Sequence, residues 1–335
     1  MTTHSFLERA SLAVQGLVLA FIAAASPVAI AQTPQTVQPA WPTRSVTFIV
    51  AAGAGSSVDV FARLLAERLQ AALGQSFIVE NRAGASGTIG TQAVARAKPD
   101  GYTYLFAGNS VLVINPLMAK DLPYNIEKDF VAVAPVSYVP LVIAVPVDHP
   151  AKTIQQLISM SKDKESFFAT PGAASLSRLI GENINTRAGT RFVNVPYPTG
   201  GAAQTDVIGG RVPVLIDGLG GAGPHAKAGR LRLLAVSTAT RAKEFPDVPS
   251  LSEAIPGFAV PGINSLVAPA GTPPAILDLL NKEIRKITED KAIVDKFATM
   301  GGDAASGSRA ELEKTLADQR VLFKKLIETA NIKAD

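Results

Sequence analysis

The sequence predicts an α/β protein of two domains. Its 335 residues are too many for one small hydrophobic core and fit two α/β domains. After Trp41 and Pro42, short apolar runs alternate with segments of helical periodicity, the pattern of βα units with mainly parallel sheets. Apolar residues make up 47% of the chain and charged residues 18%, which favours a globular over a disordered protein.

Strands are predicted where short apolar runs end in glycine, proline or polar residues. In chain order these runs are residues 45–50, 76–82, 102–108, 133–147, 165–170, 191–197, 212–218 and 231–238. A helix is predicted where Phe61, Leu65 and Leu69 recur on one face ahead of Gly74, a C-cap residue. Further helices are predicted near residues 91–97, 153–162, 171–189 and 198–210, from Pro273-Pro274 onward, and in two later stretches.

The chain is predicted to leave the first domain and later to return to it. The apolar segment 133–147 carries the first crossing, and the Pro- and Gly-rich segment 245–270 carries the return. The predicted boundaries are residues 42–140 and 258–335 for the first domain and 141–257 for the second. Ligands of open α/β sheets bind at the carboxyl ends of strands, so two such domains form a cleft.

The N-terminus predicts an export signal over residues 1–31. Arg9 precedes an apolar run, and Ala29-Ile30-Ala31 is a small-x-small cleavage site ahead of Gln32. Cleavage after Ala31 leaves a periplasmic protein. The alternative is an uncleaved membrane anchor, because the apolar stretch is nearly long enough to span a bilayer.

Composition argues against several classes of function. The formal net charge of +4 is spread along the chain without a basic stripe, so no nucleic-acid partner is expected. The sequence has no cysteine and three histidines in no metal-binding spacing, so neither a metal nor a cofactor is expected. There is no P-loop, and the hydrolase motif G-x-S-x-G is absent. His149 and His225 are expected in exposed loops, without an evident triad partner.

A recurring turn between strand and helix predicts anion binding. At Ala52–Asp59 a glycine-bearing turn leads into a helix, whose first N–H groups suit an anion. Ser56 is the expected N-cap, with Asp59 reaching back to close a capping box. Similar turns occur at residues 84–90, 170–177 and 199–205. These turns alone leave three kinds of anion open: a nucleotide phosphate, a reaction oxyanion and a carboxylate.

Three side chains near these turns each have two interpretations. Arg178, three residues beyond Ser175, either pairs with a ligand carboxylate or is a solvated helix residue. Tyr197 either offers its ring and hydroxyl to a ligand or packs in the core. Asp217 either accepts a hydrogen bond from a ligand amine or hydroxyl, or shapes a turn.

Several long segments, in one order, resemble a known family. They include WPTRSVTFIV, LPYNIEKDFVAVAPV, VPYPTGGAAQTDVIGGRVPVLIDG and AGRLRLLAVSTATRAKEFPDVPSLSEAIPGF. With the intervening sequence they resemble the periplasmic solute-binding proteins of tripartite tricarboxylate transporters, the Bug family, over essentially the whole mature chain. The resemblance implies a two-domain periplasmic binding protein fold, type II-like, with two chain crossovers and a ligand cleft that closes between the domains.

The resemblance also implies where a ligand binds. In the family, the loop after the first strand and a loop of the second domain hold a carboxylate, which corresponds here to residues 52–59 and 170–177. The predicted ligand-binding residues are Ala52, Gly53, Ala54, Gly55, Ser56, Ser57, Asn109, Ser110, Thr170, Pro171, Gly172, Ala173, Ala174, Ser175, Arg178, Tyr197, Gly200, Gly201, Ala202 and Asp217. No catalytic residue is predicted.

The predicted function is therefore capture of a small organic acid, a mono- or dicarboxylate of aliphatic or aromatic type, by a monomer that delivers it to membrane transporter subunits. The alternatives are a receptor that presents the acid to a membrane sensor kinase, and an α/β hydrolase.

The chain departs from the family pattern at five positions. They are Ala51, Ala52, Ser56, Arg178 and Pro198, where the family usually has Pro, an aromatic residue, Gly, His and Lys, respectively. These departures indicate a ligand that differs from those typical of the family.

Overall fold

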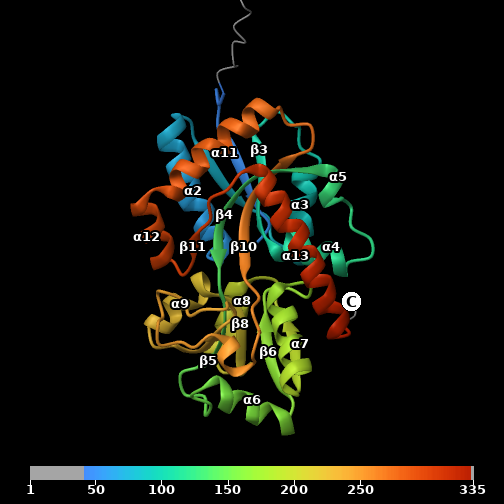
Figure 1. The fold of residues 1–335 in the computed structure, drawn as a ribbon, viewed down its shortest axis with the longest axis vertical. Helices are drawn as coiled ribbons and strands as arrows, with labels where there is room; N and C mark the ends of the chain where they lie inside the picture. Colours follow the sequence, from blue (N-terminus) through green and yellow to red (C-terminus); the bar gives the residue numbers. More distant parts are fainter. Residues whose placement is uncertain (1–40, 333–335) are drawn as a thin grey trace, which may run out of the picture. The chain divides into compact units, whose positions relative to one another are not determined.

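Two β-sheets organise residues 41–332, the part of the chain that the computed structural model describes (Figure 1). The first sheet has the order β11 (Asp303–Ala304), β4 (Phe130–Val139), β10 (Gly262–Pro269), β3 (Thr103–Gly108), β1 (Val46–Val50) and β2 (Phe77–Asn81). The second has the order β7 (Phe192–Pro196), β6 (Ser166–Thr170), β8 (Val214–Gly218), β5 (Leu141–Pro146) and β9 (Leu231–Val236). The predicted export signal lies outside the described residues.

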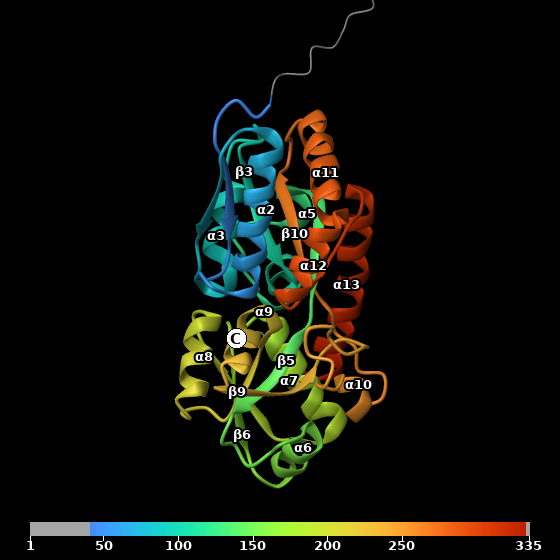
Figure 2. The same cartoon turned by 90° about the vertical axis from the view of Figure 1, so that its left-hand side faces the viewer.

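We call each sheet, together with its helices, a lobe (Figure 2). The helices of the first lobe are α2 (Ser57–Leu73), α3 (Thr88–Ala95), α4 (Asn115–Met118), α5 (Ile126–Asp129), α11 (Pro274–Glu289), α12 (Lys291–Thr299) and α13 (Arg309–Thr329), with the short 3₁₀-helix η1 (Ala85–Gly87) and the short π-helix η2 (Ser110–Ile114). Those of the second are α6 (Ile154–Asp163), α7 (Leu176–Ala188), α8 (Gly200–Ile208), α9 (Leu219–Lys227) and α10 (Leu251–Ala254). The predicted α/β fold with strands in two sheets is confirmed.

Both sheets are mixed, so the prediction of mainly parallel sheets is wrong. Strand β1 pairs in parallel with β2 and β3, and β6 pairs in parallel with β7 and β8. Strand β10 runs antiparallel between β3 and β4, and β5 runs antiparallel between β8 and β9. The physical reason is that β10 and β5 enter their lobes from the junction, where β3 and β8 end.

The chain passes between the lobes at two adjacent places. Pro140 alone separates β4 from β5, and the connection from β9 leads to β10. The two passages lie together, because Gly262 pairs with Val139 and the Ser237 N–H donates to the Leu141 carbonyl at 2.8 Å. The described residues, 41–332, belong to one compact unit. The predicted domain boundaries, with residues 42–140 and 258–335 in the first domain and 141–257 in the second, stay a prediction.

Two segments form regular elements that were not predicted. Residues 262–269 form the buried strand β10, although the surrounding sequence is rich in Pro and Gly. Residues 219–227 form α9, with Pro224 inside it, so the expected loop around His225 is wrong. His149 does lie in a turn, just after β5. Over residues 41–332, no helix combines the length and the apolar character that a membrane span requires.

The start and end of α2 follow the predicted capping residues. The Ser56 side chain accepts a hydrogen bond from the Asp59 N–H, and Gly74 ends the helix with a φ of 71°. This left-handed conformation costs glycine little, because glycine has no Cβ. Phe61, Leu65 and Leu69 are fully buried against the first sheet's core, as their helical spacing predicts.

Candidate functional site

A cavity of about 340 Å³ lies where the two lobes meet. The first lobe contributes residues from the ends of β1, β2 and β3, and the second contributes residues from the ends of β6, β7 and β8. Residues of the two passages between the lobes, including Val139, Leu141 and Ile263, complete its wall. This volume is within the range of small-molecule sites.

Twelve of the twenty predicted ligand-binding residues line this cavity. They are Ala52, Gly53, Ser56, Ser57, Asn109, Ser110, Pro171, Gly172, Ala174, Tyr197, Gly200 and Asp217. The other eight do not line it: Ala54, Gly55, Thr170, Ala173, Ser175, Arg178, Gly201 and Ala202. Ligand contact by any member of the set stays a prediction.

Several helix N-termini contribute to the lining of the cavity. The starts of α2, α7, α8 and α9 all line it, through Ser57, Leu176, Gly200 and Gly218. Each helix start carries backbone N–H groups and the positive end of a helix dipole, which favour an anion. Among the described lining residues there is no Lys, Arg or His, and Asp217 is the one charged side chain.

The turn before α2 is organised by Asp59, which is only 3% exposed. Its carboxylate accepts from the Gly55 N–H at 2.9 Å and from the amide of Asn81 at 2.9 Å, and it pairs with Arg63 at 3.0 Å. The expected capping box is therefore half right, because Asp59 reaches back to Gly55 and not to the N-cap Ser56. The Gly55 N–H is thus already engaged within the turn.

Burial disfavours the charged form of Asp59, but the hydrogen bonds from its partners outweigh burial and lower its pKa. Because this pKa is lower in the folded than in the unfolded state, the charged carboxyl increases the free energy of unfolding at any pH above the unfolded-state pKa. This contribution is lost as the pH falls through the folded-state pKa.

We expect Asp59→Asn to lower the free energy of unfolding at pH 7 by about 1.5–3 kcal/mol, the usual contribution of hydrogen bonds to a charged group. The difference from the wild type should be smaller at about pH 3 than at pH 7, because the Asp59 carboxyl becomes protonated as the pH falls toward and through its lowered pKa. Denaturant unfolding at both pH values measures it. The control is Asp295→Asn, which breaks an exposed pair with Lys291 and should change stability by about 0.5 kcal/mol or less. An equal loss for Asp59→Asn at both pH values would contradict this account.

The start of α7 is hydrogen-bonded to the first lobe. Ser110 Oγ accepts from the Leu176 N–H at 3.0 Å, and Ser86 Oγ accepts from the Ala174 N–H at 3.3 Å. Within α7, the N-cap Ser175 accepts from the Arg178 N–H at 3.2 Å. Hydroxyl groups of one lobe thus occupy backbone donors of the other, which joins the lobes around the cavity.

Arg178 does not face the cavity. Its guanidinium donates to the Ala173 carbonyl at 3.3 Å, and its Nε lies 4.0 Å from Glu182 Oε1. The side chain is thus mostly buried beside its own helix, and it is neither solvated nor in the lining. Tyr197 lines the cavity, but its hydroxyl donates to Asp206 at 2.8 Å. Both polar groups that the sequence offers to a ligand are therefore engaged within the second lobe.

Asp217 is a buried carboxyl in the cavity wall. Its Oδ2 accepts from the Gln204 side-chain amide at 2.8 Å, and its Oδ1 accepts from the Gly218 N–H at 2.7 Å. Burial raises the pKa of Asp217, while these two hydrogen bonds act in the opposite direction. Gln204 Oε1 in turn lies 3.1 Å from His225 Nε2, so His225 stands behind Gln204 and outside the lining.

Some lining residues were not predicted as site residues. Ser86 and Thr199 lie in turns that have the same sequence signal as the predicted ones, so the signal was present. Gly262, Ile263 and Asn264 carry no such signal, because they enter the wall only through the pairing of β10 with β3 and β4. In the part of the chain that the structure describes, no three His, Cys, Asp or Glu side chains gather as metal ligands would.

Residues 61–332 match the family described as the tripartite tricarboxylate transporter family receptor. The chain is 59% identical to a UPF0065 protein of Bordetella bronchiseptica over 98% of both chains. It is 35% identical to Protein BugT of Bordetella pertussis, over 92% of this chain and 93% of BugT.

Solved structures are similar over most of the chain. Rpa4515 of R. palustris with adipate has a TM-score of 0.86 at 31% identity, covering 88% of this chain and 99% of that one. The periplasmic binding protein BugD has a TM-score of 0.83 at 28% identity, covering the same shares. MatC from Rhodopseudomonas palustris with bound malate has a TM-score of 0.79 at 25% identity, covering 86% of this chain and 100% of MatC.

Proposed function

The chain belongs to the tripartite tricarboxylate transporter receptor family, and from this premise we propose that it captures a small organic carboxylate in the cavity between its lobes. The observation that carries the proposal is the convergence of four helix starts on a cavity without a cationic side chain among the described lining residues. Such a cavity stabilises a negative charge through backbone N–H groups and helix dipoles. Adipate in Rpa4515 and malate in MatC support the same chemical class.

The arrangement of side chains supports binding without catalysis. Hydrolysis by a serine nucleophile requires a base within hydrogen-bond reach of its hydroxyl. His149 lies in a turn beyond β5, and His225 is hydrogen-bonded to Gln204; neither lines the cavity. Ser57 Oγ, which is buried in the wall, has no hydrogen-bond partner in the described part of the chain. We therefore propose a receptor that releases its ligand unchanged.

Family membership supports a periplasmic receptor that delivers its ligand to the membrane subunits of a tripartite transporter. Closure of the lobes excludes water from the cavity and strengthens hydrogen bonds to the bound carboxylate. A single ligand site formed by the two lobes of one chain is consistent with a monomer.

A thermal-shift screen of the chain from Gln32 onward tests the proposal. The panel contains aliphatic and aromatic mono- and dicarboxylates, amino acids and nucleotides. A ligand at about 100 times its Kd stabilises the folded state by about 2.7 kcal/mol, so a bound acid raises the melting temperature. We expect shifts with one group of carboxylates and none with nucleotides, followed by recovery of the bound acid unchanged. Shifts with nucleotides alone, or turnover of the bound acid, would refute the proposal.

A further inference from the structure

We propose that the solute carries a single carboxylate, and that Asp217 discriminates against a second one. The inference rests on the proposed function and narrows its substrate class. It concerns the charge that the cavity accepts, and it sets this chain apart from the relatives solved with adipate and malate, each of which is a dicarboxylate.

The first step is the position of the Asp217 carboxyl. It accepts from the N–H of Gly218, the residue that precedes α9, at 2.7 Å. Its Oδ2 lies so close to Gly200, the first residue of α8, that a Cβ there would be 2.8 Å from it. The protein's own carboxyl therefore already faces the starts of α8 and α9, two of the helices whose N-termini line the cavity.

The second step is the supply of hydrogen-bond donors near the starts of α7 and α2. At α7, the Leu176 and Ala174 N–H groups donate to Ser110 and Ser86. Before α2, the Gly55 N–H donates to Asp59. A carboxylate offers about four acceptor sites, so each one bound needs several donors. These donors are therefore engaged within the protein, whereas Ser57 Oγ is buried without a hydrogen-bond partner in the described residues.

The third step is the absence of a compensating cation. No Lys, Arg or His side chain lines the described cavity. A second carboxylate beside Asp217 would place two like charges close together in a buried space, or would require a proton on one of them. Between the helix starts the wall is apolar, with Val139, Leu141 and Ile263, which suits an uncharged remainder of the solute.

Isothermal titration with matched pairs of acids tests the inference on the wild-type chain. Hexanoate is compared with adipate, and benzoate with terephthalate, so that each pair differs by one carboxylate. We expect the monocarboxylate of at least one pair to bind about tenfold or more tightly than its partner, because the like-charge penalty applies only to the second carboxylate. Dicarboxylates that bind equally or more tightly would overturn the inference while leaving the proposed function intact. A failure of all carboxylates to bind would instead overturn the proposed function, and the inference with it.

The variant Asp217→Asn tests whether Asp217 causes the preference for monocarboxylates over dicarboxylates. It keeps the shape and a hydrogen-bonding oxygen but removes the charge, so we expect the ratio of monocarboxylate to dicarboxylate affinity to fall by about fivefold or more. The matched control is Asp206→Asn on α8, since Asp206 pairs with Tyr197 and Arg211 and does not line the cavity. Its ratio should equal that of the wild type. An unchanged ratio in Asp217→Asn would refute the role of Asp217. The wild-type comparison still decides the inference if this variant does not fold.

Discussion

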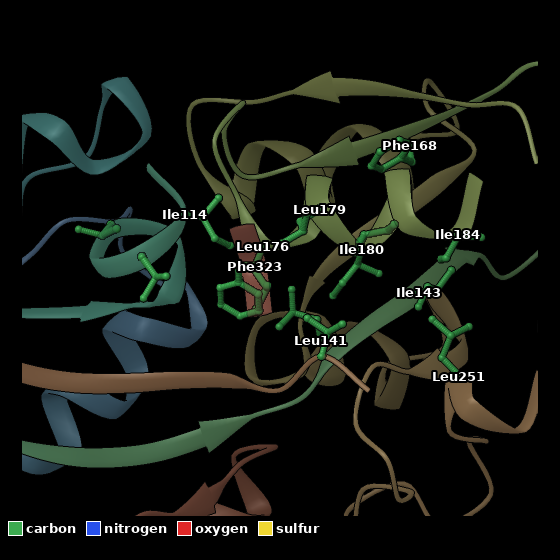
Figure 3. Packing of buried hydrophobic residues seen from close by; sticks show 14 of the residues in the cluster. Ile114, Leu141, Ile143, Phe168, Leu176, Leu179, Ile180, Ile184, Leu251 and Phe323 are labelled. Carbon is green, nitrogen blue, oxygen red and sulfur yellow. The ribbon is translucent and has the colours of Figure 1, made fainter. Parts of the chain in front are cut away.

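Replacing Phe323 by alanine is expected to destabilise the protein by about 3–5 kcal/mol, the usual cost of removing a buried aromatic side chain. Phe323 is fully buried, although it lies in α13, near the end of the described chain. It belongs to a cluster that contains Ile114 of the first lobe and Leu141 and Leu176 of the second (Figure 3). Its loss therefore leaves a cavity where the two lobes pack together.

Denaturant unfolding of the purified variant measures this effect. The matched control is Val321→Ala, two residues earlier in the same helix, because Val321 is 73% exposed. A surface substitution of this kind changes stability by about 0.5 kcal/mol or less. Equal losses for the two variants would mean that α13 does not pack between the lobes as described.

The position of Phe323 gives α13 a role that the sequence did not predict. The sequence predicts two passages of the chain between the lobes, one in the apolar segment 133–147 and one in the Pro- and Gly-rich segment 245–270. Helix α13 packs on β4 and η2 in the first lobe and also on α7 in the second. One turn before Phe323, the Gln319 side chain accepts from Asn109, a residue of the cavity wall, at 2.6 Å. The helix thus connects the ligand cavity to the packing between the lobes.

Local signals in the sequence were sufficient for most elements of the fold. Helical periodicity, the N-cap Ser56 and the C-cap Gly74 define α2 without reference to any other segment. Strand β10 could not be found in this way, because it follows a Pro- and Gly-rich segment. Its position in the sheet depends on pairing with β3 and β4, which lie far away in the sequence. The antiparallel character of the sheets follows from the same long-range pairing and was missed for the same reason.

The candidate site, too, was predictable only in part from the sequence. The turns that form it were predictable, because each joins a strand end to a helix start. The engagement of individual groups was not, since it depends on neighbours that only the folded chain supplies. Asp59 takes the Gly55 N–H, Ser110 takes a donor of α7, and Arg178 bonds to its own turn. Sequence alone thus located the loops but overestimated how many of their donors remain for a ligand.

The second large effect is expected at Gly53, where the lobes touch. A Cβ at Gly53 in the first lobe would lie 2.7 Å from Cγ2 of Thr199 and 2.9 Å from its Cβ. Thr199 cannot easily turn away, because its hydroxyl caps α8 by accepting from the Ala202 N–H. A valine at position 53 therefore holds the lobes apart on this side of the cavity.

A carboxylate bound between the lobes then loses the hydrogen-bond donors that one of the lobes supplies. The loss of two charge-assisted hydrogen bonds, at about 1.5 kcal/mol each, corresponds to about 100-fold weaker binding. We expect this loss in Gly53→Val with the acid that the thermal-shift screen identifies. Ala72→Val is the control, since Ala72 is exposed on α2 of the same lobe and does not line the cavity. If Gly53→Val binds as tightly as this control, the solute does not require the lobes to meet at Gly53 and Thr199.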